Sequence, residues 1–275
     1  MTSPEPLLEI RGLTLTYRSR GRPALTALDG VDLTLGPGET LSVVGESGSG
    51  KTTLGNAVLG LATPSAGTIR FAGEDITSPS ERRRRELTRE IQVVFQDPHG
   101  SLNPVRTIVQ TLEEPLLAHR RLGRAQRREQ VGAALRRVGL DAESAGRYPA
   151  QFSGGQLQRI AIARALMLSP RLLICDEAVS ALDLSVQAQI LNLLAQLQRE
   201  MGLGYLFISH DLAVVRHISD RVAVLYRGRV VETGTATEVC ERPQHPYTRA
   251  LLAAAPVPDP AEQRRRRAGA AQPIV

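Results

Sequence analysis

The 275-residue sequence contains no tryptophan, and aromatic residues make up only 3% of it. Its two cysteines, Cys175 and Cys240, are too few for a disulfide framework and are typical of a protein in a reducing compartment. No apolar run approaches the ~20 residues that a membrane-spanning helix needs. The N-terminus also lacks the basic and apolar regions of a secretory signal. These absences predict a soluble, cytoplasmic chain.

Lysine is almost absent as well, because Lys51 is the only lysine among 34 Lys and Arg residues. The formal net charge is +6, but the runs Arg82–Arg85 and Arg264–Arg267 together carry more positive charge than this net value. Aromatic residues do not interleave with these runs, as a stacking surface for single-stranded nucleic acid requires. We therefore expect a solvated helix face and a disordered tail, with a nucleic-acid site as the alternative.

Short apolar strands alternate with helical segments along the chain, which predicts an α/β fold with a largely parallel sheet and an inserted helical piece. A turn is expected at Asp29-Gly30, within the second strand. Strands are expected at 7–17, 24–35, 39–45, 67–73, 90–96, 171–177, 203–211 and 220–228, and helices within 106–168 and at 184–202 and 212–218.

The single lysine lies in "GESGSGKT", Gly45–Thr52, which fits the pattern G-x-x-x-x-G-K-[ST] between an apolar strand and a helical segment. Glycines let backbone N–H groups surround phosphate oxygens, and the helix that begins near Gly50 directs its positive end at them. Lysine is a compact charge on a flexible stem that reaches between β- and γ-phosphates, whereas the arginine fork suits surface contacts. The expected ligands are ATP and Mg²⁺, with the Thr52 hydroxyl on the metal. The predicted loop residues are Gly45, Glu46, Ser47, Gly48, Ser49, Gly50, Lys51, Thr52 and Thr53.

Two adjacent acids, Asp176 and Glu177, end the apolar strand "RLLICDE". Acids at the end of a buried strand are costly unless they meet a cation or a reacting group. We expect Asp176 to be a Mg²⁺ partner and Glu177 to polarise an attacking water. The alternative is that both acids cap the following helix.

The segment "SGGQ", Ser153–Gln156, stands at the start of a helical pattern. The serine can cap the helix, and the two glycines leave N–H groups that can bind a second anion. A plain capped helix is the alternative, although two glycines would weaken it.

The phosphate loop, "SGGQ", "CDE", "SALD" and "SHD" follow one another in an order that resembles the nucleotide-binding subunit of an ATP-binding-cassette (ABC) transporter over about residues 5–235. The resemblance implies a P-loop NTPase core with a mainly parallel sheet, an antiparallel β-subdomain and an α-helical subdomain inserted at about 97–168. It also implies that two subunits enclose two ATP molecules. The phosphate loop of one subunit then faces Ser153, Gly154, Gly155 and Gln156 of the other.

The resemblance also implies roles for residues outside the phosphate loop. Tyr17 matches the aromatic residue that stacks on adenine, and Gln96 matches the glutamine that reaches Mg²⁺ and the attacking water. Asp183 ends the loop, 180–183, that crosses the dimer, and His210 matches the histidine at the γ-phosphate. The implied catalytic residues are Glu177, His210, Gln96 and Lys51, and the implied metal ligands are Thr52, Gln96 and Asp176.

Within the family, "VVFQDPHGSLNPVRTI" and "ERPQHPYTRALLAAAPVPDP" resemble the ATPase subunits of dipeptide and oligopeptide importers, a group that includes nickel relatives. This implies two transmembrane permease subunits, a second and non-identical ATPase subunit, an extracytoplasmic solute-binding protein, and a place at the cytoplasmic face of the cell membrane. The ATPase domain is expected at 1–235 and a C-terminal extension at 236–275, with disorder from about 256. No cysteine follows Cys240, so we expect no iron–sulfur cluster, and we expect Cys175 to be a small core residue. The alternative functions are a DNA-repair or translation ATPase and a regulator that does not hydrolyse ATP.

The stretch after Gln96 is expected to be a stiff surface loop, because Asp97-Pro98 and Asn103-Pro104 each restrict the residue before proline. Such a loop can transmit a shift at the phosphate site to the helical segment that follows. We expect Leu102 to make an apolar contact with the membrane partner. An ordinary connecting loop is the alternative.

Overall fold

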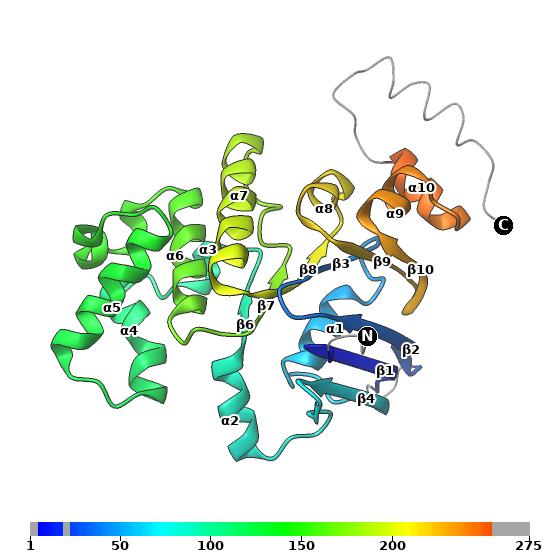
Figure 1. Ribbon diagram of the computed structural model, residues 1–275, viewed down its shortest axis with the longest axis horizontal. Coiled ribbons are helices and arrows are strands. Elements are labelled where there is room, and N and C mark those ends of the chain that lie inside the picture. The colour runs from blue at the N-terminus through cyan, green and yellow to red at the C-terminus, as the bar shows by residue number, and fades with distance from the viewer. Residues whose placement is uncertain (1–4, 19–22, 255–275) are drawn as a thin grey trace.

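The computed structural model describes residues 5–18 and 23–254 and is centred on a six-stranded sheet (Figure 1). The strand order is β10-β9-β3-β8-β7-β6, in which β10 pairs antiparallel with β9 and the other neighbours pair in parallel. The expectation of a mainly parallel sheet is therefore confirmed. Its strands are β3 (Thr40–Val44), β6 (Ile91–Val94), β7 (Leu172–Asp176), β8 (Gly204–Ser209), β9 (Arg221–Tyr226) and β10 (Arg229–Thr235).

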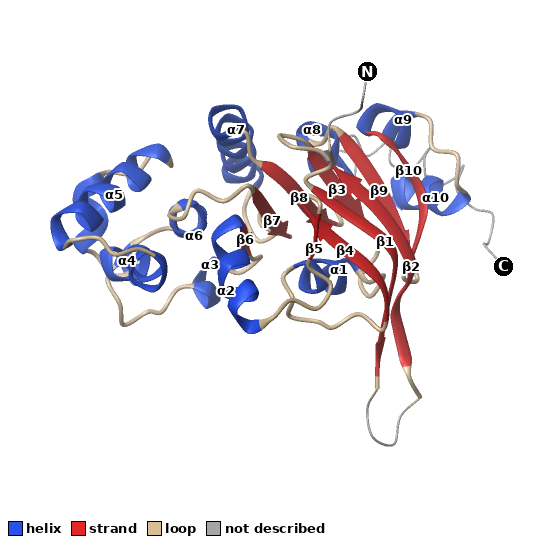
Figure 2. Ribbon diagram, turned by 60° about the horizontal axis from the view of Figure 1, so that its bottom comes forward, coloured by secondary structure: helices blue, strands red, loops and turns tan. Residues whose placement is uncertain are grey.

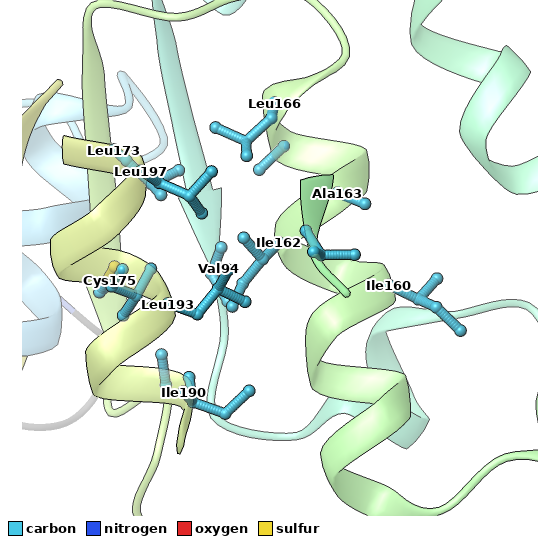
Figure 3. Packing of buried hydrophobic residues seen from close by; sticks show 14 of the residues in the cluster. Val94, Ile160, Ile162, Ala163, Leu166, Leu173, Cys175, Ile190, Leu193 and Leu197 are labelled. Carbon is cyan, nitrogen blue, oxygen red and sulfur yellow. The ribbon is translucent and has the colours of Figure 1, made fainter. Parts of the chain in front are cut away.

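Both faces of this sheet are buried, because side chains alternate between two apolar clusters along its strands. On β7, Leu172 and Ile174 join a cluster that includes Leu54 of helix α1 (Lys51–Val58). Leu173 and Cys175 join the cluster on the other face, which contains side chains of helices α6 (Gly154–Leu166) and α7 (Leu184–Met201) (Figure 3). Cys175 is fully buried there, as expected for a core residue.

A second, four-stranded antiparallel sheet covers α1 in the order β2-β1-β4-β5 (Figure 2). The expected turn at Asp29-Gly30 is wrong, because β2 continues through both residues. Gly30 instead has a φ of +65° at an irregularity in the pairing with β1, where glycine accommodates an extra residue in one strand. The strands are β1 (Leu8–Tyr17), β2 (Leu25–Leu35), β4 (Ala66–Phe71) and β5 (Glu74–Asp75).

The first arginine run lies on helix α2 (Glu81–Glu90), whose N-terminus is capped by the Ser80 side chain. Three of its arginines form ion pairs with acids, namely Arg82 with Glu86, Arg83 with Glu74, and Arg85 with Glu81. The expectation of a solvated helix face is confirmed for this run. The second run, Arg264–Arg267, lies outside the described residues.

Helices fill the chain between β6 and β7 and form the part of the molecule at the left of Figure 1. Gly139, which follows α5 closely, has a φ of +75°, a value that glycine adopts readily after a helix end. Besides α6, this part contains α3 (Pro98–Ser101), α4 (Ile108–His119), α5 (Arg124–Arg137) and the short 3-10 helices η1 (Ala142–Gly146) and η2 (Pro149–Gln151).

After β8 the chain forms α8 (Leu212–Ile218), and after β10 it forms α9 (Ala236–Glu241) and α10 (Pro246–Ala254). Side chains of these three helices pack in a third apolar cluster with Val44, Val222 and Val224 of the central sheet. The expected disorder from about residue 256 falls outside the described residues. Within residues 5–18 and 23–254, no helix has the length and apolar character needed to cross a membrane.

Candidate active site

The phosphate loop leaves the fully buried strand β3 and ends where α1 begins at Lys51. The backbone is packed so closely at two of its glycines, Gly45 and Gly50, that neither has room for a side chain. A Cβ atom on Gly45 would lie 2.2 Å from the carbonyl oxygen of Leu225, and one on Gly50 would lie 2.4 Å from that of Ala27. Both residues also have positive φ values, 157° and 109°. The loop is therefore packed against β2 and β9.

Lys51 lies under this loop with only 5% of its surface exposed. Its Nζ donates hydrogen bonds to the carbonyl oxygens of Gly45, at 2.7 Å, and Glu46, at 2.9 Å. Burial lowers the pKa of Lys51, whereas the charges of Glu177, Asp176 and Glu46 act in the opposite direction. The site therefore contains a desolvated cation beside carboxylates.

The phosphate loop also contains a buried polar atom without a partner. Ser49 is 5% exposed, and its Oγ has no hydrogen-bond partner among the described residues. A buried hydroxyl without a partner is costly. Ser49 does not belong to the pocket lining that contains Ser47, Gly48 and Lys51, so it is the buried lysine that favours an anion in the loop.

Asp176 ends β7, and its Oδ1 accepts a hydrogen bond of 3.4 Å from the hydroxyl of Thr52. Burial and the neighbouring charge of Glu177 raise the pKa of Asp176, while Thr52 and Lys51 act in the opposite direction. A half-buried carboxylate beside a second carboxylate and a hydroxyl is an oxygen-rich set of the kind that Mg²⁺ prefers. The donor set therefore fits this cation.

Glu177 follows immediately and has a φ of 51°, an uncommon value for a residue other than glycine. Its N–H donates to the carbonyl oxygen of Ile208, and its own carbonyl oxygen accepts from the N–H and hydroxyl of Ser180. These bonds stabilise a backbone geometry that otherwise costs ~1 kcal/mol or more. The side-chain Oε1 lies 3.2 Å from Nδ1 of His210.

The loop, the acid pair and Tyr17 line one pocket of about 800 Å³. Of the predicted residues, the lining contains Tyr17, Ser47, Gly48, Gly50, Lys51, Thr52, Thr53, Gln96, Asp176 and Glu177. His210 does not line the pocket but contacts Glu177, which does. Gly45, Glu46 and Ser49 belong to the same loop but do not line the pocket.

Sequence reasoning missed a second group of lining residues, namely Leu25, Thr26, Ala27, Phe95, Asp97, Arg227 and Gly228. Nothing in the local pattern of 25–27 indicates a ligand. Arg227 and Gly228, however, follow β9 directly, and ligands of parallel sheets gather at the carboxyl ends of the strands. That rule would have found these two residues.

The remaining predicted residues lie away from the pocket lining, at the adjoining N-termini of α6 and α7. The side chains of Ser153 and Gln156 cap α6 reciprocally. The Asp183 carboxylate accepts from the N–H groups of Ser185 and Val186, and these hydrogen bonds lower its pKa.

Gly155 lies where the starts of α6 and α7 are in contact. A Cβ atom there would lie 2.4 Å from Cγ1 of Val186, whereas one on Gly154 would lie 3.9 Å from its nearest neighbour, Cδ2 of Leu182. The second glycine of "SGGQ" thus allows α6 to approach α7 closely. One chain does not bring this group into the pocket that the phosphate loop lines.

Sequence comparison identifies two regions of the chain. The family model described as ABC transporter matches residues 28–180, and the model described as oligopeptide/dipeptide transporter, C-terminal region, matches residues 231–275.

Similar proteins include transport ATP-binding proteins. The oligopeptide transport ATP-binding protein OppF of Salmonella typhimurium is 54% identical over 88% of this chain and 73% of its own length. The glutathione import ATP-binding protein GsiA of the same organism is 52% identical over 96% of this chain, which spans only 43% of that relative.

A similar solved structure is the dimeric post-hydrolysis state of the ATP-binding cassette MJ0796 bound to ADP and Pi. It has a TM-score of 0.75 and 31% identity, and the match covers 83% of this chain and 98% of that one. The chain therefore belongs to the ABC transporter family, as an ATP-binding subunit of the oligopeptide and dipeptide importer group.

Proposed function

We propose that this chain hydrolyses ATP to drive the import of a peptide or related small solute through a membrane transporter. The observation that carries the proposal is the meeting of Lys51, Thr52, Asp176 and Glu177 in one pocket. A nucleic-acid ATPase is not favoured, because the similar proteins are named as transport and import subunits.

In this proposal the nucleotide extends across the pocket from Tyr17 to the phosphate loop. Tyr17, 46% exposed, offers a ring face on which the adenine can stack. Lys51 and the backbone N–H groups at the start of α1 bind the phosphates. Thr52, Asp176 and Gln96 would hold Mg²⁺, which supplies neutralisation of phosphate charge when it is bound.

Hydrolysis then depends on how this chain places one water. Glu177 orients that water and accepts its proton, because its carboxylate is held at the pocket edge by the backbone bonds described above. His210, whose Nδ1 is 3.2 Å from Oε1 of Glu177, orients the Glu177 carboxylate and in this account would contact the γ-phosphate. Gln96 lines the same pocket and reports the presence of phosphate to the following segment.

A second ATPase subunit completes each site in this account. The start of α6, with Ser153, Gly154 and Gly155, offers N–H groups to an anion but does not line its own chain's pocket. Two chains facing each other would bring this helix start to the γ-phosphate held by the partner's phosphate loop. ATP would then bind between the two chains, and hydrolysis would release them.

The proposed assembly contains two transmembrane permease subunits, this chain and a non-identical second ATPase subunit at the cytoplasmic face of the cell membrane. An extracytoplasmic binding protein delivers the solute. The solute class is proposed from the relatives named for oligopeptides and glutathione, and the ATPase chain itself does not contact it.

The test is to purify the chain with its two permease subunits and the second ATPase subunit, and to reconstitute the complex in liposomes. We expect uptake of short peptides that requires ATP on the side of this chain, and stimulation of ATP hydrolysis by the loaded binding protein. If nickel stimulates hydrolysis and peptides do not, the proposed solute class is wrong and nickel takes the place of peptides. Absence of ATP hydrolysis would reject the proposed function.

A further inference from the structure

Tyr247 of α10, in the C-terminal extension, contacts the phosphate loop through its side chain. The Tyr247 hydroxyl accepts a hydrogen bond of 3.0 Å from the backbone N–H of Glu46. The two residues are separated by 201 positions in the sequence. Tyr247 is 5% exposed and packs in the same apolar cluster as Val44, the last residue of β3.

The peptide group that Tyr247 contacts also holds the lysine of the loop. The N–H of Glu46 and the carbonyl of Gly45 belong to one planar peptide unit. Its N–H donates to Tyr247 Oη, and its carbonyl oxygen accepts from Lys51 Nζ at 2.7 Å. Rotation of this unit would therefore break both contacts together, so the tyrosine sets the orientation of a carbonyl that fixes the lysine.

The Tyr247 ring packs against the ring of Tyr226, the last residue of β9, with their centroids 4.1 Å apart. The guanidinium of Arg227 in turn lies 5.0 Å from the centroid of the Tyr226 ring. Arg227 lines the nucleotide pocket. A chain of contacts thus connects α10 with the pocket wall as well as with the phosphate loop.

The start of α10 is anchored to the central sheet by Glu232 of β10. Its carboxylate accepts hydrogen bonds from the backbone N–H groups of Gln244, at 2.7 Å, and His245, at 3.0 Å. Nδ1 of His245 in turn accepts from the N–H of Tyr247 at 3.1 Å. These bonds leave Tyr247 little freedom to leave the loop.

We propose that Tyr247 is a positioning residue for nucleotide binding, through which the C-terminal extension fixes the Gly45–Glu46 peptide and thereby Lys51. The proposal rests on the proposed binding of ATP phosphates by Lys51. Burial raises the pKa of Tyr247, so its hydroxyl is neutral under physiological conditions and accepts the Glu46 N–H without adding a charge near the phosphates. In this chain the extension then takes part in forming the nucleotide site.

The test compares Tyr247→Phe with a matched variant, Tyr205→Phe. Both remove one hydroxyl from a buried tyrosine, but the Tyr205 hydroxyl donates to the carbonyl oxygen of Leu194, away from the loop. The measurements are the Kd of a fluorescent ATP analogue for the full-length chain and the Tm without nucleotide. We expect both variants to lower Tm by about 2–4 °C, as the loss of one hydrogen bond does in a chain of this size. Only Tyr247→Phe should raise the Kd, by about threefold to tenfold.

A second readout separates positioning from general loosening. In the assembled transporter, Tyr247→Phe should raise the KM for ATP by a similar factor while kcat at saturating ATP stays within about twofold, because the reacting groups are untouched. An unchanged Kd in Tyr247→Phe, or an equal rise in Tyr205→Phe, would overturn the inference while ATP binding by the wild type stands. Absence of binding by the wild type would overturn the proposed function and this inference with it.

Discussion

Nδ1 of His210 lies 3.2 Å from Oε1 of Glu177, although the two residues follow different strands of the central sheet. The strands β7 and β8 are parallel neighbours, so their carboxyl ends bring the two side chains together at one edge. Glu177 is mostly shielded, with 20% of its side chain exposed, whereas 53% of the His210 side chain is exposed. The carboxylate is therefore oriented by an imidazole that a ligand can still reach.

Glu177→Gln should abolish hydrolysis without abolishing binding. The amide keeps the shape of the side chain but cannot accept a proton from water, so turnover should fall by roughly two to four orders of magnitude. ATP should still bind, and the ATPase subunits should remain associated in its presence, as seen by size-exclusion chromatography. Glu200→Gln, an exposed site on α7, is the control and should leave turnover unchanged. Normal turnover in Glu177→Gln would assign the base elsewhere, with His210 the first candidate.

The phosphate loop and the acid pair were predictable from the sequence because each depends on neighbouring residues. A strand that runs into glycines and a lysine fixes its own local geometry, and two acids after an apolar strand need a partner wherever that strand lies. Leu25–Ala27 were not predictable in this way. They reach the pocket through pairing and packing between distant segments, which no local pattern records.

Gly155→Ala should destabilise the contact between α6 and α7. The new methyl group would start 2.4 Å from Cγ1 of Val186, a stiff β-branched side chain, so the two helix starts must move apart. We expect a loss of about 1–3 kcal/mol in the free energy of unfolding, measured by urea denaturation. Gly154→Ala is the matched control, since its nearest contact would be 3.9 Å, and it should cost under about 1 kcal/mol. Equal stability of the two variants would contradict the role given to Gly155.

The segment after Gln96 was expected to be a surface loop, but it is partly helical and partly buried. Its first part is a short helix, α3, that begins at Pro98, where the fixed φ of proline suits a first helical turn. The expected surface contact by Leu102 is wrong, because Leu102 is 2% exposed and packs in the core cluster of the helical part. Arg164 of α6 donates a hydrogen bond of 2.6 Å to the carbonyl oxygen of Ser101, which holds the end of α3 against α6. Val105 is the exposed apolar side chain of the segment, at 78%.

Val105→Glu and Leu102→Glu should therefore have different consequences. Val105→Glu should leave folding and ATP binding by the isolated chain intact while it reduces transport and transport-stimulated hydrolysis, because a charge would replace the exposed apolar side chain that we propose as a contact for the permease. Leu102→Glu should cost more than about 4 kcal/mol of folding stability, since it buries a carboxylate in the core. Thermal unfolding of the isolated chain and uptake by the reconstituted transporter check both. Normal transport with Val105→Glu would remove this side chain from the coupling contact.

Two further features could not be decided from local sequence patterns. Asp29-Gly30 has the composition of a turn, but the same glycine geometry also suits an irregularity inside a long strand, and the pairing of β2 with β1 decides between them. The contact between Tyr247 and the N–H of Glu46 joins residues at opposite ends of the chain. Only the folded arrangement of α10 against β9 and β10 reveals it.

The affinity of Lys51→Arg for ATP tests the account most directly. Lys51 is buried and its Nζ donates to two carbonyl oxygens of the loop, a setting that suits a compact ammonium group and not a wide, planar guanidinium, so a change that preserves the charge should still remove nucleotide binding. We expect the Kd for ATP, measured by isothermal titration calorimetry on the full-length chain, to rise at least about 100-fold, with hydrolysis lost in the assembled transporter. The reverse change on the surface, Arg82→Lys at a side chain 91% exposed, should leave both unchanged. Near-wild-type affinity and turnover in Lys51→Arg would contradict the role given to the only lysine of the chain.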